Sequence, residues 1–131
     1  MGDSASKRKA GLAKMTEVYG DDRGFAERLA DLPPESAPYS EETVDRLFAE
    51  IWNRPGLSVR DRRLLTIGVT AALGRADLAE VQFVGALTNG ELDRAQIGEV
   101  ILHLAYYAGW PNAQAMHRGA TAALERMPDA G

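Results

Sequence analysis

The sequence contains no cysteine among its 131 residues. Disulfide bonds, thiolate metal sites and thiol redox chemistry within the chain are therefore excluded. Long apolar runs are also missing, because no stretch reaches the roughly 18 apolar residues that a membrane-spanning helix needs. The first residues are polar and lack the apolar core of a secretory signal. We therefore expect no membrane partner and a cytoplasmic location.

A broad excess of basic residues is lacking as well. The chain carries 15 Lys and Arg against 19 Asp and Glu, which gives a formal net charge of −4. Because nucleic-acid surfaces need an extended basic field, we expect no nucleic-acid partner. His103 and His117 do not form an i, i+4 pair, and glycine-rich phosphate motifs are absent. We therefore expect no metal and no other cofactor.

Helix signals are clear from residue 40 onward. Ser40, Ser58 and Asp93 are predicted N-caps, while Gly74 and Asn89–Gly90 are predicted to end helices. The alternating pattern of β-strands is missing throughout. The sequence predicts an all-α fold, a compact antiparallel bundle of about six helices with short connections.

The first 40 residues have weaker signals than the rest. We expect an N-terminal arm over residues 1–40 and a helical domain over residues 41–128. The polar residues 1–10 are expected to be mobile. Further along the arm, the sequence predicts short helices over residues 11–19 and 25–32 and an extended linker over residues 33–39.

Residues 96–110 predict a helix with two occupied faces. At about 100° per residue, Glu99, His103, Tyr106 and Trp110 fall on the side that would ordinarily face water. The segment contains no Lys or Arg, and a helix with so little charged surface is normally covered on both sides. The second cover is a ligand pocket, a neighbouring subunit, or both. The opposite, apolar side comprises Ile97, Val100, Ile101, Leu104 and Ala108.

Several segments, taken in order and at their spacing, resemble the carboxymuconolactone decarboxylase family. The resemblance extends from residue 51 to about residue 123. It implies a small all-α fold that assembles into homotrimers or homohexamers, with sites in clefts between helices close to subunit contacts. The segments that carry it are IWNRPGL (51–57), DRRLLT (61–66), AALG (71–74), GALTNG (85–90) and EVILHLAYYAGWP (99–111).

Two chemistries are associated with proteins of this kind. The first is cofactor-free decarboxylation of a carboxylated muconolactone during the breakdown of aromatic acids. The second is an alkylhydroperoxidase-D type reaction that uses a Cys-x-x-Cys pair with a nearby His and Glu. The corresponding positions here hold Arg75, Leu78, Gln82 and Arg63, so thiol peroxidase chemistry is excluded. Decarboxylases of the family commonly carry His where this chain has Gln82, and glutamine cannot shuttle a proton.

Decarboxylation needs a proton donor, groups that hold the carboxylates, and a dry wall. We predict His103 as the proton donor and Glu99, one helical turn earlier, as the residue that orients it. Tyr106 is a predicted polar contact of the substrate, and Trp110 a predicted apolar wall. The alternative is that His103 is a core or interface histidine bonded to Glu99.

The carboxylate anchor is predicted to be Arg63, which lies near Thr66 and Thr70 on its helix. Gln82 is a further predicted polar contact of the substrate. The alternative for Arg63 is an ion pair with an acid across a helix interface, and for Gln82 an ordinary interhelix hydrogen bond. Arg60 is interpreted as a solvated surface charge.

These residues favour a lyase of the carboxy-lyase type that acts on a small anionic cyclic or unsaturated acid. An alternative is a non-catalytic small-molecule-binding or assembly protein of the same fold, which Gln82 and the missing cysteines favour. A third reading, an accessory protein that acts through the thiols of a partner, rests on superfamily association alone.

Overall fold

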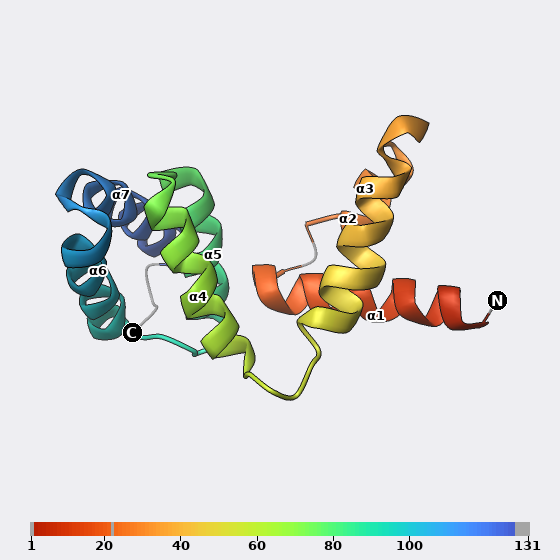
Figure 1. The fold of residues 1–131 in the computed structure, drawn as a ribbon, viewed down its shortest axis with the longest axis horizontal. Helices are drawn as coiled ribbons and strands as arrows, with labels where there is room; N and C mark the ends of the chain where they lie inside the picture. The colour runs from red at the N-terminus through yellow and green to blue at the C-terminus, as the bar shows by residue number, and fades with distance from the viewer. Residues whose placement is uncertain (1, 22, 128–131) are drawn as a thin grey trace. The chain divides into compact units, whose positions relative to one another are not determined.

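The computed structural model describes residues 2–21 and 23–127, and its regular elements there are all helical, which confirms the predicted all-α class (Figure 1). No helix in this part of the chain is long and apolar enough to cross a membrane. The chain divides into two compact units, Met1–Leu57 and Ser58–Gly131. The elements are α1 (Gly2–Tyr19), α2 (Phe25–Ala30), the 3₁₀-helix η1 (Pro34–Ser36), α3 (Ala37–Glu41), the π-helix η2 (Glu42–Ile51), α4 (Val59–Ala72), α5 (Ala76–Thr88), α6 (Arg94–Ala108) and α7 (Trp110–Arg126).

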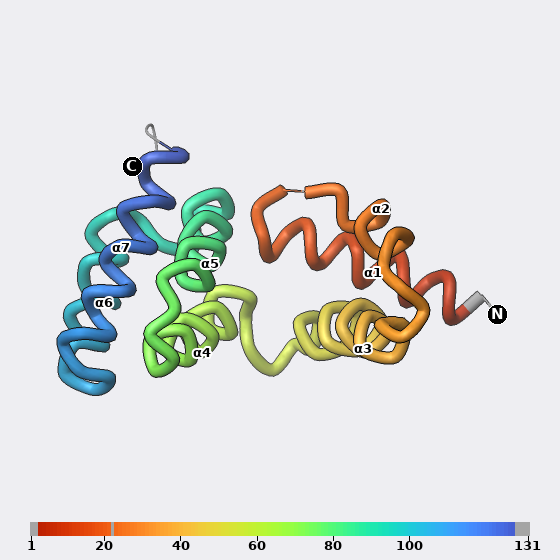
Figure 2. Tube along the Cα trace, turned by 90° about the horizontal axis from the view of Figure 1, so that it is seen from above, coloured from red at the N-terminus to blue at the C-terminus, as the bar shows by residue number. Residues whose placement is uncertain are grey.

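The first unit is built on the packing of α1 against η2 (Figure 2). Val18 of α1 and Val44 of η2 are buried. Gly11 permits the close approach, because a Cβ atom there would overlap the carbonyl oxygen of Val44. The Arg8 guanidinium forms an ion pair with Asp45 at 2.8 Å, which adds a polar contact between the same two helices.

Three predictions for the N-terminal arm are wrong. Residues 2–10 belong to α1, and residues 34–39 lie in η1 and α3 instead of an extended linker. Ser40 lies inside α3, where its hydroxyl donates to the carbonyl of Ala37, so it is not an N-cap. The predicted helical domain over residues 41–128 stays a prediction; by their contacts, residues 41–57 group with the N-terminal helices.

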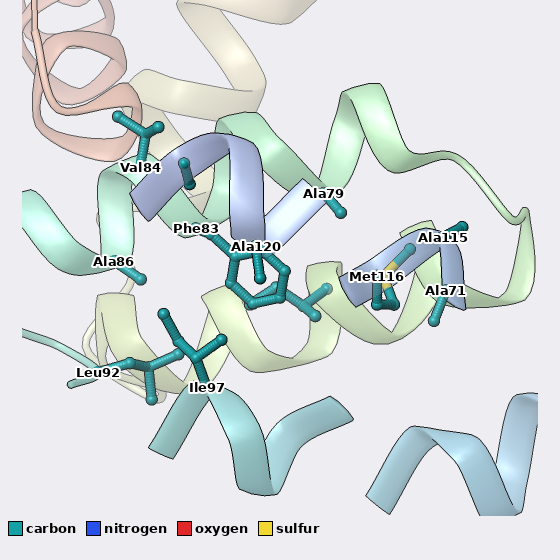
Figure 3. Packing of buried hydrophobic residues seen from close by; sticks show 12 residues of the cluster. Ala71, Ala79, Phe83, Val84, Ala86, Leu92, Ile97, Ala115, Met116 and Ala120 are labelled. Carbon is teal, nitrogen blue, oxygen red and sulfur yellow. The ribbon is translucent and has the colours of Figure 1, made fainter. Parts of the chain in front are cut away.

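The second unit contains α4 to α7 around one hydrophobic core. Phe83 of α5, Ile97 of α6 and Met116 of α7 are buried together there (Figure 3). The two N-caps predicted in this unit are confirmed, because the Ser58 hydroxyl accepts from the Asp61 amide at 3.0 Å and Asp93 forms a reciprocal capping box with Gln96. Such caps satisfy amides that have no partner inside the helix.

The close approach of α5 and α7 depends on Gly119. A Cβ atom there would lie 2.8 Å from the carbonyl oxygen of Ala76 and 3.0 Å from the amide nitrogen of Glu80. Because these are backbone atoms, we expect Gly119→Ala to lower the free energy of unfolding by about 1–3 kcal/mol. Gly68→Ala is the control: it meets nothing within 4 Å and should raise stability by about 0.5–1 kcal/mol. Equal melting temperatures for the two variants in thermal unfolding would contradict this account.

An exposed ion pair at the N-terminus of α5 lowers the pKa of a carboxyl group. The Arg75 guanidinium donates to both carboxylate oxygens of Asp77, at 2.8 and 2.7 Å. These hydrogen bonds lower the pKa of Asp77 from its ordinary 3.8 to about 2. Since the pKa is depressed in the folded state, the pair stabilises the fold above pH 4 and this contribution disappears as the pH falls towards about 2.

We therefore expect an NMR titration of the Asp77 carboxyl to give a midpoint near pH 2, and Arg75→Ala to move that midpoint up towards 3.8. An unchanged midpoint in the variant would show that the guanidinium is not the cause.

Candidate functional site

A groove runs between α4 and α6 within the second unit. Its volume is about 470 Å³, and His103 and Glu99 of α6 face it together with Arg60 of α4. The walls are mainly aliphatic, and Gln96 adds a neutral polar group. The complete lining is Arg60, Leu64, Leu92, Gln96, Glu99, Val100, His103 and Leu104.

His103 sits at the surface of the chain, beside this groove. Its ring stacks on Tyr107 with the ring centroids 4.8 Å apart. Among the described side chains, no hydrogen bond joins His103 to Glu99, although both line the groove. An exposed imidazole beside aliphatic walls is placed to transfer a proton to a bound molecule. The exposure also means that His103 is not a core residue within one chain.

Arg63 and Gln82 come together at a different place, in the interior. Arg63 is 0% exposed, and its Nε and Nη2 donate to the two carboxylate oxygens of Glu91 at 2.9 and 3.1 Å. Its Nη1 donates to the side-chain oxygen of Gln82 at 3.1 Å. Arg63 therefore forms the ion pair that the alternative interpretation described. Its role as a substrate anchor, and that of Gln82 as a substrate contact, stay predictions.

Tyr106 and Trp110 lie away from the groove. Their rings meet edge to face with centroids 5.5 Å apart, and Tyr106 is 75% exposed. Trp110 lines a second hollow of about 240 Å³, together with His117 of α7. The indole and the His103 imidazole therefore do not face the same hollow.

Apolar side chains remain uncovered on three helices of this unit. Large hydrophobic residues on α6 and at the start of α7 are more than half exposed, and so are two residues of α4 and the leucine that follows it. The predicted second cover of α6 is thus missing within a single chain. These exposed residues are Leu65 and Val69 of α4, Leu73 directly after it, Leu102, Tyr106 and Tyr107 of α6, and Trp110 of α7.

Sequence reasoning missed two residues of this region. Glu91, in the connection between α5 and α6, accepts from Arg63 and also from the side-chain amide of Asn89 at 3.1 Å. Arg60 lines the groove, although its sequence neighbours suggested a solvated charge. Its spacing of four residues before Leu64 places both on one helix face, and this signal was available in the sequence.

Within residues 2–21 and 23–127, no group of three or more histidine and acidic side chains is placed to hold a metal ion. The site consists of an aliphatic groove, one imidazole, one exposed guanidinium and one carboxylate. These groups are suited to binding a small acid and transferring a proton to it.

The chain is similar to a known protein family and to two curated decarboxylases. The family model for the carboxymuconolactone decarboxylase family matches residues 38–122. The chain is 34% identical over 110 residues to the 4-carboxymuconolactone decarboxylase of Acinetobacter baylyi, which covers 83% of this chain and 81% of that protein. It is 33% identical over 86 residues to the nitrosuccinic acid decarboxylase of Metarhizium robertsii, which covers 64% of this chain and 58% of that protein.

No solved structure matches the chain. The chain belongs to the carboxymuconolactone decarboxylase family, which confirms the resemblance found in its sequence. The match begins at residue 38 and therefore includes η2 of the first unit and most of the second unit.

Proposed function

We propose that this protein is a cofactor-free decarboxylase that acts on a small anionic cyclic or unsaturated acid. The observation that carries the proposal is the groove between α4 and α6, where His103 stands beside aliphatic walls and a guanidinium. Both curated relatives are named as decarboxylases of small acids, a carboxymuconolactone and nitrosuccinic acid.

The proposed reaction needs no oxidant or reductant. The bond between the carboxylate and its neighbouring carbon breaks, carbon dioxide leaves, and the electron pair moves onto an adjacent electron-withdrawing group. A proton from the His103 imidazolium then adds to the carbon that lost the carboxylate. The aliphatic walls favour the first step, because burial in an apolar site disfavours the charged carboxylate more than its less localised product.

The remaining predicted residues have supporting roles in this proposal. Glu99 lies one turn before His103 and stabilises the charged form of the imidazole. Tyr106 lies in the hollow next to the groove, which Glu99 and His103 also line. Trp110 faces a different hollow and is assigned no contact with the substrate in this proposal. Gln82 lies beside Arg63 in the interior and is assigned no proton transfer, because an amide does not titrate near neutral pH.

The direct test is the release of carbon dioxide from 4-carboxymuconolactone and nitrosuccinic acid by the purified chain. We expect turnover of at least one of them, with the loss of carbon dioxide visible by mass spectrometry and with no reduction of the rate by a metal chelator. Binding of these acids without turnover would instead support the non-catalytic alternative, which the glutamine at position 82 favours. If the chain neither binds nor turns over these acids, both the decarboxylase proposal and the non-catalytic alternative are rejected.

We also propose that copies of this chain associate as a homotrimer or homohexamer. The exposed apolar residues of α4 and α6 support this, because large uncovered apolar patches on soluble proteins mark interaction surfaces.

Leu102 is 52% exposed in the middle of α6. Leu102→Glu should therefore shift the chain towards monomer in sedimentation velocity at micromolar concentration. Thr121→Glu, which adds the same charge to the exposed side of α7, should not. A wild-type chain that sediments only as a monomer would contradict the proposal.

A further inference from the structure

We propose that Arg60, and not Arg63, holds the carboxylate of the small acid that binds in the groove between α4 and α6. The inference rests on the proposed function for the location of the site and names the residue that selects anionic ligands there.

Arg63 has no free hydrogen-bonding edge to offer a ligand. The side-on edge of its guanidinium, Nε and Nη2, is paired with both oxygens of Glu91, and Nη1 donates to Gln82. The residue is 0% exposed and does not line the groove. Freeing it for a ligand would leave the Glu91 carboxylate, itself only 9% exposed, without its counter-ion.

Arg60 lines the groove, whereas Arg63 does not. Its Nε donates to the backbone carbonyl of Glu91 at 3.0 Å, which fixes the plane of the guanidinium at the groove wall. Its side chain is 43% exposed, and Nη1 approaches a carboxylate oxygen of Asp61 only to 4.0 Å. The end-on edge formed by Nη1 and Nη2 therefore remains for a bidentate contact with a carboxylate.

The rest of the lining is consistent with an anion at this position. Among the described lining residues, Arg60 is the only side chain with a permanent positive charge. The side-chain oxygen of Gln96 accepts from the Asp93 amide at 3.0 Å, so its NH₂ group is left as a donor beside the groove. Glu99 carries the opposite charge, and with His103 it also lines the adjacent hollow, next to Tyr106 and Tyr107. A ligand carboxylate is thus directed towards Arg60 and away from Glu99.

The proposed roles of Arg60 and His103 predict different kinetic effects when each residue is replaced. Arg60 binds a carboxylate that is present before and after the loss of carbon dioxide, so its removal should raise KM and the dissociation constant more than it lowers kcat. His103, on α6 across the groove from α4, should show the reverse pattern because its contribution arises during proton transfer.

The test uses cis,cis-muconate as a stable unsaturated dicarboxylate and its dimethyl ester as the uncharged control. Binding to the wild-type chain, Arg60→Gln, Arg60→Lys and Arg94→Gln is measured by calorimetry and by NMR, with circular dichroism to verify folding. Arg94→Gln is the matched control, because it removes an equal charge at the start of α6 without changing the groove lining.

We expect the wild type to bind muconate and not the ester, Arg60→Gln to weaken binding about 10-fold or more, and Arg60→Lys to fall in between. Arg94→Gln should change binding less than about two-fold, as for a screened surface charge.

Equal effects of Arg60→Gln and Arg94→Gln, or no binding of muconate to the wild type, would overturn the inference. Muconate binding that depends on Arg60 without release of carbon dioxide from any substrate would uphold it and reject the decarboxylase proposal. Turnover with an unchanged KM in Arg60→Gln would uphold the decarboxylase proposal and reject the role of Arg60.

Discussion

Replacement of Arg63 by methionine should lower the free energy of unfolding by about 3–5 kcal/mol, which is the usual effect of removing one partner of a buried ion pair. The variant leaves the Glu91 carboxylate, which is 9% exposed, without either of its two hydrogen bonds from the guanidinium. It also removes the donor to Gln82. Urea denaturation followed by circular dichroism measures the loss directly.

Two further variants test whether the loss of stability comes from the unpaired buried charge. Arg63→Met combined with Glu91→Leu removes both charges and should recover much of the stability, because apolar replacements of a buried pair are often neutral or stabilising. Arg75→Met breaks the exposed pair with Asp77 and should lower the unfolding midpoint much less than Arg63→Met does, because exposed pairs contribute little. If Arg63→Met unfolded at the same urea concentration as Arg75→Met, the buried pair would not contribute to the fold.

Replacement of His103 by alanine should reduce kcat for decarboxylation by about 100-fold or more, in the range expected for loss of a general acid. The imidazole lines the groove and stacks on Tyr107, whose ring remains in the variant, so the groove itself should persist. Initial rates of carbon dioxide release measure the effect. Added imidazole should restore part of the rate, because a small acid of the same chemistry fits the space that the side chain leaves.

The second histidine of the chain provides the control for this result. His117 lies on α7, lines the hollow beside Trp110 and does not face the groove. His117→Ala should therefore keep the wild-type kcat and KM. A folded His103→Ala variant with an unchanged rate would reject the assignment of the proton donor.

Local signals explain why the helices of the second unit were predictable. Ser58 and Asp93 cap α4 and α6 through hydrogen bonds to residues three positions later, so the information lies within one helical turn. Helices α4 and α5 end where the sequence predicts, because Gly74 and Gly90 adopt positive φ angles just beyond their last residues.

The helices predicted over residues 11–19 and 25–32 correspond to the second half of α1 and to α2, but the full extent of the N-terminal helices was not predictable in the same way. Helix α1 contacts η2 through the Arg8–Asp45 pair, which joins residues 37 positions apart, and through the absence of a side chain at Gly11. Contacts of such long range leave no periodic signal in the segment itself, and tertiary packing commonly overrides local propensity.

Part of the candidate site was predictable from periodicity, and part required the folded chain. Helical spacing placed Glu99 and His103 on the uncovered side of α6, and both line the groove. The partner of Arg63 is Glu91, 28 residues away, and no spacing rule identifies it. Arg60 was missed because a charge in the first turn of a helix ordinarily faces solvent, whereas here the connection between α5 and α6 folds over it.

Glu91 divides two tasks between its side chain and its main chain. The carboxylate neutralises a buried cation, while the peptide carbonyl orients the guanidinium that faces the groove. Because these contacts come from different atoms of one residue, changing the groove arginine leaves the interior charge balance intact. Substitutions at position 60 can therefore change which ligands bind with little loss of thermal stability. A substitution at position 91 would change ligand binding and stability together.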